Sequence, residues 1–133
     1  MTTGEFERVF SGVPCEGEVG YCRALRAGNL VYVTGTAPVA ARGGLHAPGD
    51  AYEQARRCWQ IVAAALAGLG ADLSAVVRTR MFVTDITRWR DYGRAHREAF
   101  GDHPPATAMV EIRALIDPAM LIEVEADAVV GER

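Results

Sequence analysis

Two segments decide the fold: Pro104-Pro105-Ala106-Thr107-Ala108-Met109-Val110-Glu111-Ile112-Arg113 and Met120-Leu121-Ile122-Glu123-Val124-Glu125-Ala126. Each alternates with a period of two, which is the pattern of a half-buried β-strand. The predicted apolar faces consist of Ala108, Val110 and Ile112 in the first strand and of Met120, Ile122, Val124 and Ala126 in the second. We therefore predict two strands of one sheet, joined by the loop around Asp117-Pro118.

The opposite face of this sheet is predicted to carry both signs of charge. With regular alternation it holds Arg78, Arg80, Glu111, Arg113, Glu123, Glu125 and Asp127. Cross-strand ion pairs on a solvated surface explain such a mixture. Packing against copies of the same chain explains it equally well, because a small domain with one bare sheet face is a candidate for symmetric assembly. The pattern leaves both explanations open.

Four more strands are predicted upstream from their branched and aromatic residues. They cover residues 5–11, 21–26, 30–34 and 76–83. A turn at residues 27–29 joins two of them into a hairpin, and loops are predicted over residues 12–19 and 36–48. Gly35 ends the run at 30–34, where a missing side chain lets a ligand or another backbone approach closely.

Helical spacing predicts two helices between these strands. The first begins with a capping box formed by Asp50, as N-cap, and Glu53. Its apolar stripe consists of Ala55, Cys58, Trp59, Val62, Ala65, Leu66 and Leu69. The second is predicted from Thr87, as N-cap, to Gly101, and its buried face consists of Trp89, Tyr92, His96 and Phe100. The order β-β-β-α-β-α-β-β predicts an α+β domain with two helices packed on one face of a mixed sheet.

Length and composition predict one globular domain over residues 1–133, since half of the residues are hydrophobic. No run approaches the roughly 18 apolar residues of a membrane span. The first residues form neither the basic segment nor the apolar core of a signal peptide. We therefore expect a cytoplasmic protein without a membrane partner.

The charge balance argues against nucleic acid as a partner. The formal net charge is −3, whereas domains that bind nucleic acid carry a basic stripe. All 14 basic residues are arginines, so the chain has no lysine for Schiff-base catalysis. Any anion-binding role falls to arginine, whose planar guanidinium binds a carboxylate through two parallel hydrogen bonds.

Common metal and catalytic motifs are missing from the sequence. The three cysteines form no C-x-x-C pair, and His46, His96 and His103 have no chelating spacing, so we expect neither a metal nor a cofactor. Glu123 is the carboxylate best suited to acid–base chemistry, because burial in the middle of a strand raises a carboxyl pKa. An ion pair with an arginine on a neighbouring strand is the alternative role for Glu123.

Eight segments match, in order, those of a known family. They are Gly20-Tyr21, Ala27-Gly28-Asn29-Leu30-Val31-Tyr32-Val33-Thr34-Gly35, Glu53-Gln54-Ala55-Arg56, Val76-Val77-Arg78-Thr79, Phe82-Val83-Thr84-Asp85, Glu98-Ala99-Phe100, Pro105-Ala106 and Ile122-Glu123-Val124-Glu125-Ala126. On these residues the chain resembles the Rid family (YjgF/YER057c/UK114, or endoribonuclease L-PSP). The resemblance implies a chorismate-mutase-like α+β fold and a homotrimer with three clefts between subunits. It also implies that the bare sheet face looks toward the centre of that trimer.

The resemblance further implies a reaction. The best-known members of the family hydrolyse reactive enamines and imines, such as 2-aminoacrylate, to 2-keto acids and ammonia without a cofactor. In them an arginine after the Pro-Ala pair anchors the substrate carboxylate, and a glutamate of the last strand positions or activates water. A tyrosine before the hairpin and the glycine that ends the next strand complete the cleft. By position, these last three residues correspond to Glu123, Tyr21 and Gly35.

The anchoring arginine is replaced in this chain. Thr107 stands in its place, and a hydroxyl carries no charge and makes no fork. A family cysteine two residues on is Met109 here, and a cleft asparagine of the second helix corresponds to Arg94. The chain thus resembles a divergent Rid subgroup that lacks the arginine.

Three functional hypotheses follow. The first is an enamine or imine deaminase whose Glu123 handles water and whose anion contact comes from Arg94, or less plausibly from Arg113 of a neighbouring subunit. The second is a trimer that binds a small molecule, such as a carboxylate, in the same clefts without turnover. The third is the ribonuclease of the family's older label, which the acidic balance and the absence of a histidine pair make weakest.

Overall fold

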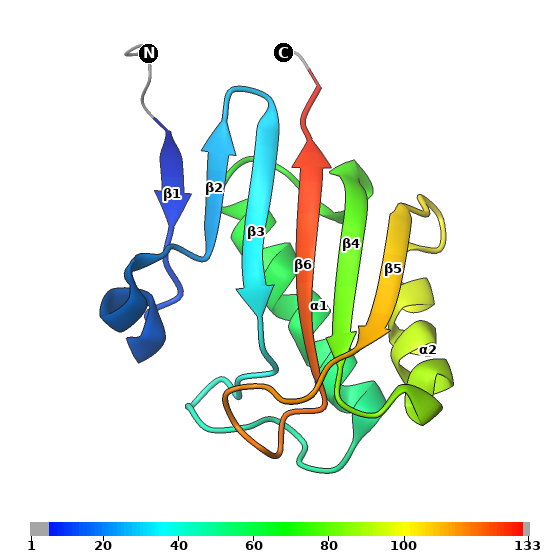
Figure 1. Cartoon of the computed structure of the whole chain (residues 1–133). Helices are drawn as coiled ribbons and strands as arrows, with labels where there is room; N and C mark the ends of the chain where they lie inside the picture. The colour runs from blue at the N-terminus through cyan, green and yellow to red at the C-terminus, as the bar shows by residue number, and fades with distance from the viewer. Residues whose placement is uncertain (1–5, 132–133) are drawn as a thin grey trace.

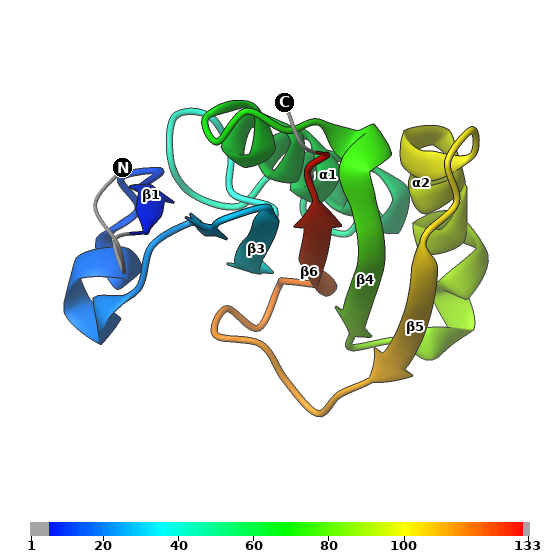
Figure 2. The ribbon, with the colours of Figure 1, turned by 90° about the horizontal axis from the view of Figure 1, so that it is seen from above.

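The computed structural model describes residues 6–131, which form a six-stranded sheet with helices on one face (Figures 1 and 2). The elements are β1 (Glu7–Val9), the π-helix η1 (Glu16–Gly20), β2 (Ala24–Ala27), β3 (Leu30–Thr36), α1 (Ala51–Ala67), the 3₁₀ turn η2 (Leu73–Ala75), β4 (Val76–Val83), the 3₁₀ turn η3 (Ile86–Arg88), α2 (Trp89–Phe100), β5 (Ala106–Glu111) and β6 (Ile122–Val129). The predicted α+β architecture, with two helices on one face of a mixed sheet, is confirmed.

The strand order is β1-β2-β3-β6-β4-β5. The last strand, β6, therefore lies at the centre, antiparallel to β3 on one side and to β4 on the other. β4 and β5 are parallel, and α2 makes the crossover between them. The two strands that were predicted first are thus in one sheet, but β4 separates them.

The core lies between the sheet and α1, which lies behind the sheet in Figure 1. The predicted apolar stripe is confirmed, since all seven of its residues are buried, and the last of them, Leu69, lies just beyond the end of α1. Asp50 caps the helix and accepts a hydrogen bond of 2.9 Å from the Glu53 amide, so half of the predicted capping box forms. The Glu53 side chain instead lies 3.4 Å from Arg56.

The second helix begins later than predicted. Thr87 is not its N-cap, because the Asp85 carboxylate accepts hydrogen bonds from the Thr87 amide and hydroxyl and so caps the turn η3. α2 starts at Trp89, which is 48% exposed and not on the buried face. Within residues 6–131, neither α1 nor α2 has the length and apolar character that crossing a membrane requires.

The bare face differs from the predicted one on β5. Thr107 and Met109 lie beside the buried Thr79 and Met81 of β4, so this side of β5 faces the helices. Glu111 shares that side and accepts a hydrogen bond from the Ile86 amide. The predicted apolar face, including Val110 at 46% exposure, is therefore the open one.

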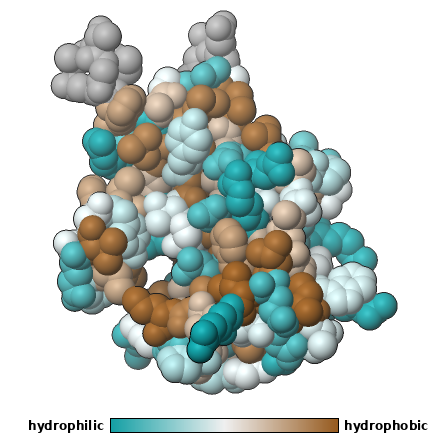
Figure 3. Space-filling view, in the orientation of Figure 1, coloured by the Kyte–Doolittle hydropathy of each residue, from teal (hydrophilic) through white to brown (hydrophobic). Residues whose placement is uncertain are grey.

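The charged face differs from the prediction in two further features. Arg113 lies beyond the end of β5, so it is not a strand residue. A register shift between Val76 and Arg78 puts an extra residue into β4, and Val77 is 49% exposed instead of buried with Thr79. Arg80 keeps the predicted position and lies 3.6 Å from Glu125 and 3.2 Å from Asp127. Figure 3 accordingly shows hydrophilic and hydrophobic side chains interspersed on this face.

The N-terminal segment is more structured than predicted. The strand expected over residues 5–11 is only Glu7–Val9, and position 5 lies outside the described residues. The loop expected over residues 12–19 contains η1, one turn of π-helix. The strand expected over residues 21–26 is Ala24–Ala27, and that over 30–34 continues through Gly35 to Thr36.

A matched pair of isoleucines tests which surface forms the core. Ile122→Ala removes a fully buried side chain at the start of β6, and we expect it to lower the free energy of unfolding by about 2–5 kcal/mol. Ile116→Ala, at 78% exposure, should change it by no more than about 0.5 kcal/mol. Urea denaturation at one protein concentration measures both. Equal losses in the two variants would contradict the burial described above.

Candidate functional site

A groove of about 1090 Å³ opens at the edge of the sheet between η1, the end of β3 and the loop that follows β3. In Figure 3 it is the hollow at the lower left. Three of the five residues predicted for the site line it: Tyr21, Gly35 and Glu123. They come from the segment before β2, from β3 and from β6, so the antiparallel pairing of β3 with β6 brings two of them together.

Glu123 and Gly35 are in direct contact. A Cβ atom on Gly35 would lie 2.6 Å from Oε1 of Glu123, so only glycine leaves room for the carboxyl group in this position. Burial raises the pKa of the Glu123 carboxyl, the charge of Arg23 opposes that rise, and Glu125 adds to it. A half-buried carboxyl group with a raised pKa, at the wall of a groove, is suited to exchanging protons with a bound molecule.

A buried ion pair beside these residues was not predicted from the sequence. Arg23 and Glu16 are 6% and 4% exposed, and Nη2 of Arg23 lies 3.1 Å from Oε2 of Glu16. The Glu16 carboxylate also accepts hydrogen bonds from the amides of Ser11 and Gly12 and from the Ser11 hydroxyl. Burial on its own raises the pKa of Glu16, but these hydrogen bonds together with those from Arg23 lower it below the ordinary value.

Arg23 connects this ion pair to the wall of the groove. Its Nη1 donates to the Gly35 carbonyl at 2.9 Å and to the Thr36 hydroxyl at 3.3 Å. Its guanidinium carbon lies 5.5 Å from the centre of the Tyr21 ring. Arg23 therefore fixes the backbone of Gly35 and the ring of Tyr21 relative to each other. Its nitrogens are largely used in these contacts, so the geometry favours a supporting role over a ligand contact.

The other two predicted site residues, Thr107 and Arg94, lie elsewhere in the chain. Thr107 is on the edge strand β5, and β4 lies between it and the strand β6 that carries Glu123, which is roughly 10 Å of sheet. It faces the helices, whereas Glu123 faces the open side. Arg94 lies with its guanidinium carbon 3.6 Å from the centre of the Tyr52 ring of α1. A single chain therefore does not bring Thr107 or Arg94 to Glu123, and their roles as ligand contacts stay predictions.

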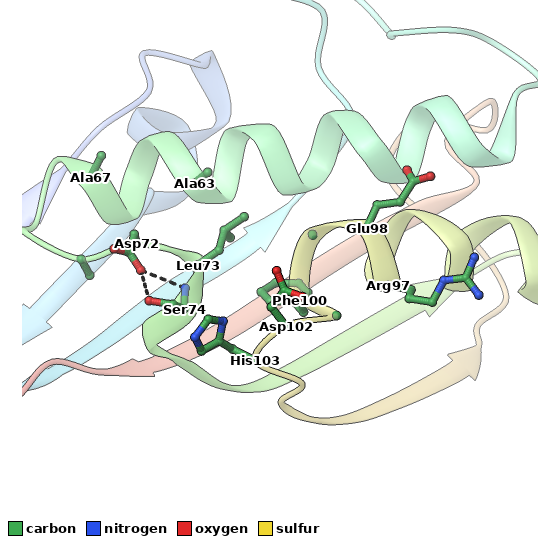
Figure 4. Close-up of a pocket in the computed structure, with 13 residues that line it drawn as sticks. Ala63, Ala67, Asp72, Leu73, Ser74, Arg97, Glu98, Phe100, Asp102 and His103 are labelled. Carbon is green, nitrogen blue, oxygen red and sulfur yellow. Dashed lines mark hydrogen bonds between the residues drawn. The ribbon is translucent and has the colours of Figure 1, made fainter.

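A second cavity, of about 510 Å³, lies between the C-terminal ends of α1 and α2 (Figure 4). Asp72, Ser74 and His103 line it, which are residue types of hydrolytic sites. Asp72, however, accepts hydrogen bonds from the amide and the hydroxyl of Ser74 and so caps the turn η2. None of the predicted site residues lies in this cavity, and the groove beside Glu123 is the stronger candidate. Among residues 6–131, no group of three or more side chains is arranged to hold a metal ion.

Comparison with known proteins gives a consistent family. Residues 15–130 match the family model described as endoribonuclease L-PSP. The crystal structure of Rv2704 from Mycobacterium tuberculosis, a member of the YjgF/YER057c/UK114 family, is 45% identical with a TM-score of 0.86, over 95% of this chain and all of that one.

Two relatives are similar in sequence. An uncharacterised protein of Streptomyces coelicolor is 36% identical over 132 residues, which is 98% of this chain and 97% of the relative. The 3-aminoacrylate deaminase RutC of Acinetobacter baylyi is 31% identical over 107 residues, which is 78% of this chain and 82% of the relative.

The Glu16–Arg23 pair generates a stability prediction. Glu16→Gln leaves the buried Arg23 guanidinium without its counter-charge, and we expect a loss of about 3 kcal/mol in the free energy of unfolding at pH 7. The folded-state pKa of Glu16 is below its ordinary value of 4.5, so the carboxylate stabilises the fold above pH 4.5 and this contribution is lost as the pH falls through the folded-state pKa.

Denaturation between pH 7 and pH 3 measures this effect. The wild type should lose more stability than Glu16→Gln over the acidic part of that range. Glu18→Gln, two residues along η1 and exposed, is the control and should follow the wild type. Identical pH profiles for the wild type and Glu16→Gln would show that the pair contributes nothing.

Proposed function

The chain belongs to the YjgF/YER057c/UK114 (Rid) family, and from this premise we propose that it hydrolyses a small reactive enamine or imine and releases ammonia. The observation that carries the proposal is the Glu123 carboxyl group, held against Gly35 in the groove with its pKa raised by burial. That a relative is named a 3-aminoacrylate deaminase supports the reaction class. The replacement of the family's anchoring arginine by Thr107 argues for a substrate other than 2-aminoacrylate.

The proposed reaction needs proton transfers and one water molecule. Protonation of the enamine carbon gives the iminium ion, and water adds to its C=N carbon with loss of one proton to give the carbinolamine. Protonated on nitrogen, the carbinolamine then expels ammonia and gives up its hydroxyl proton, which leaves a carbonyl compound. Glu123 donates the first proton as a neutral acid and then, as a carboxylate, takes a proton from the attacking water. A carboxyl group whose pKa lies nearer neutrality populates both forms under working conditions, and burial shifts Glu123 in that direction.

We propose that the working form is a homotrimer with the site between subunits. The open sheet face exposes Leu30, Tyr32, Val110 and Val129, each 39–46% exposed, around the charged residues of β4 and β6. Burying these apolar side chains favours association of such faces. Thr107 is on the edge strand β5 and faces the helices, whereas Glu123 is on the central strand β6 and faces the open side, so a cleft between two subunits is the proposed arrangement in which they meet.

The anion contact differs from the one in the best-known members. Arg94 is the proposed replacement because it is exposed and on α2, on the same side of the sheet as Thr107. Its present partner is the Tyr52 ring, whose hydroxyl donates to Glu98 at 2.5 Å. Arg94 can bind a ligand anion only if its guanidinium leaves the Tyr52 ring. The loss of that contact would weaken the binding of the substrate.

A trimer that binds a small carboxylate without turnover is the second candidate. The observation that favours it is Thr107, which offers a hydroxyl where a charged fork is expected. Ribonuclease activity remains the weakest alternative. His96 is hydrogen-bonded to Thr79 and His103 lies at the other cavity, so neither is near Glu123.

The activity test is ammonia release from enamines and imines generated in the assay, including 2-aminoacrylate and 3-aminoacrylate. We expect acceleration of at least one substrate, and a fall in kcat/KM of about 10²–10⁴-fold in Glu123→Gln. Glu53→Gln, a partly exposed carboxylate at the start of α1 and outside the groove, is the control and should retain wild-type kinetics. No acceleration across the panel, with ligands still found by an affinity screen, would replace the enzyme proposal by the binding one.

A substitution at position 107 tests the missing anchor. Thr107→Arg supplies a guanidinium at the expected position, and we expect a gain of about tenfold or more in kcat/KM for 2-aminoacrylate, since a charge-assisted hydrogen bond is about twice as strong as a neutral one. An unchanged rate would mean that the arginine is not the only group this chain lacks for that substrate.

The oligomeric state is tested by multi-angle light scattering. We expect a particle of three times the chain mass of 14.3 kDa. Val110→Arg puts a charge on the open face and should shift the distribution toward the monomer. A monomeric wild type would contradict the trimer and the sites between its subunits.

A further inference from the structure

The three side chains His96, Thr79 and Thr107 form a continuous chain of hydrogen bonds from the helix layer to the edge of the sheet. Nε2 of His96 lies 2.8 Å from the Thr79 hydroxyl oxygen, and that oxygen lies 2.7 Å from the Thr107 hydroxyl oxygen. Thr79 is fully buried, His96 is half-buried and Thr107 is exposed. The chain thus leads from a titratable group inside the protein to the hydroxyl that replaces the family's arginine.

The Thr79 hydroxyl has a single proton, so the chain has two polarities. In the first, His96 donates from Nε2 to Thr79, Thr79 donates to Thr107, and the Thr107 proton points outward. In the second, Thr107 donates to Thr79, Thr79 donates to Nε2, and Thr107 presents only oxygen lone pairs outward. The imidazolium form of His96 carries a proton on Nε2 and therefore permits only the first polarity.

We propose that protonation of His96 switches Thr107 into a hydrogen-bond donor for a ligand oxygen, so that the site binds carboxylates or other oxygen acceptors more tightly when His96 is charged. The proposal deepens the proposed function, since it rests on Thr107 lining the ligand cleft. It assigns His96 and Thr79 as positioning residues that act through Thr107. The permanently charged arginine of the family is thus replaced by a hydroxyl whose donor role depends on the protonation of His96.

The surroundings of His96 fit such a switch. From α1 it faces the Trp59 ring, with centroids 5.4 Å apart, and from its own helix the Phe100 ring at 4.7 Å. From β4 it faces the Thr79 hydroxyl, and none of these groups titrates near neutral pH. Burial alone lowers the pKa of His96, and no charged side chain of residues 6–131 contributes to that shift. A bound anion is therefore free to act as the first counter-charge.

The size of the effect follows from the distance. Three hydrogen bonds separate Nε2 of His96 from a ligand oxygen on Thr107, a path of roughly 8 Å. Coulomb's law with an effective dielectric constant between 80 and 20 gives an affinity gain of about two- to thirtyfold on protonation. By linkage, the same ligand raises the pKa of His96.

The test follows the His96 ring by NMR in the ¹⁵N-histidine-labelled full chain, with acetate as the probe. Of the three histidine signals, that of His96 is identified as the one missing from His96→Gln. We expect acetate to raise the pKa of His96, and acetate affinity to increase two- to thirtyfold from pH 8 to a pH below the pKa of His96. Thr107→Ser should keep this coupling, because it keeps the hydroxyl.

Thr107→Val and the nearly isosteric Thr79→Val should abolish the coupling, each by removing one link. An undiminished shift in either variant, or no effect of acetate on His96 in the wild type, would overturn the proposal. The readout does not depend on turnover. If the enamine assays fail but acetate still shifts His96, the proposed reaction is wrong and the switch stands. If the enamine assays succeed but acetate has no effect on His96, the switch is wrong and the proposed reaction stands.

Discussion

The position of β6 between β3 and β4 is the constraint on which the rest of the molecule depends. It joins the hairpin β2–β3 to the parallel pair β4–β5, which otherwise share no strand pairing among the described residues. One face of β6 packs toward α1, and its side chains are all buried: Ile122, Val124, Ala126 and Ala128. Its other face carries Glu123 to the groove and Glu125 and Asp127 to the open side. A slip of one residue would exchange these two sets and bury three carboxylates.

The groove is built by polar contacts that support one another. The Glu16 carboxylate accepts hydrogen bonds from the segment at Ser11 and Gly12 and from Arg23. Arg23 in turn donates to the Gly35 carbonyl and lies against the Tyr21 ring. Such a buried pair costs desolvation energy, and its benefit is a single geometry at the wall where Glu123 lies. The support comes from Glu16 and Arg23, whose polar groups are used within the wall of the groove.

Much of this fold was predictable from residue patterns because local periodicity and burial agree. The stripe of α1, its cap at Asp50 and the strand β6 follow from spacing alone. The errors arise where tertiary contacts prevail. The bulge at Val77 shifts one residue out of alternation, and β5, an edge strand, turns its apolar side to the open face that Val110 shares. The partnership of Glu16 with Arg23 joins residues of a predicted loop and a strand, and no periodicity marks it.

The central place of β6 also bears on how the chain folds. Val31 pairs with Ala128, so this contact closes a loop of about 100 residues. Until that closure occurs, the central strand of the sheet is missing. Contacts of such long sequence separation slow folding, because the entropy of closure is lost before the pairing is gained. During synthesis β3 and β4 emerge well before β6, and each then presents an unpaired edge to other chains. Occupancy of nascent-chain chaperones should therefore be highest over this interval.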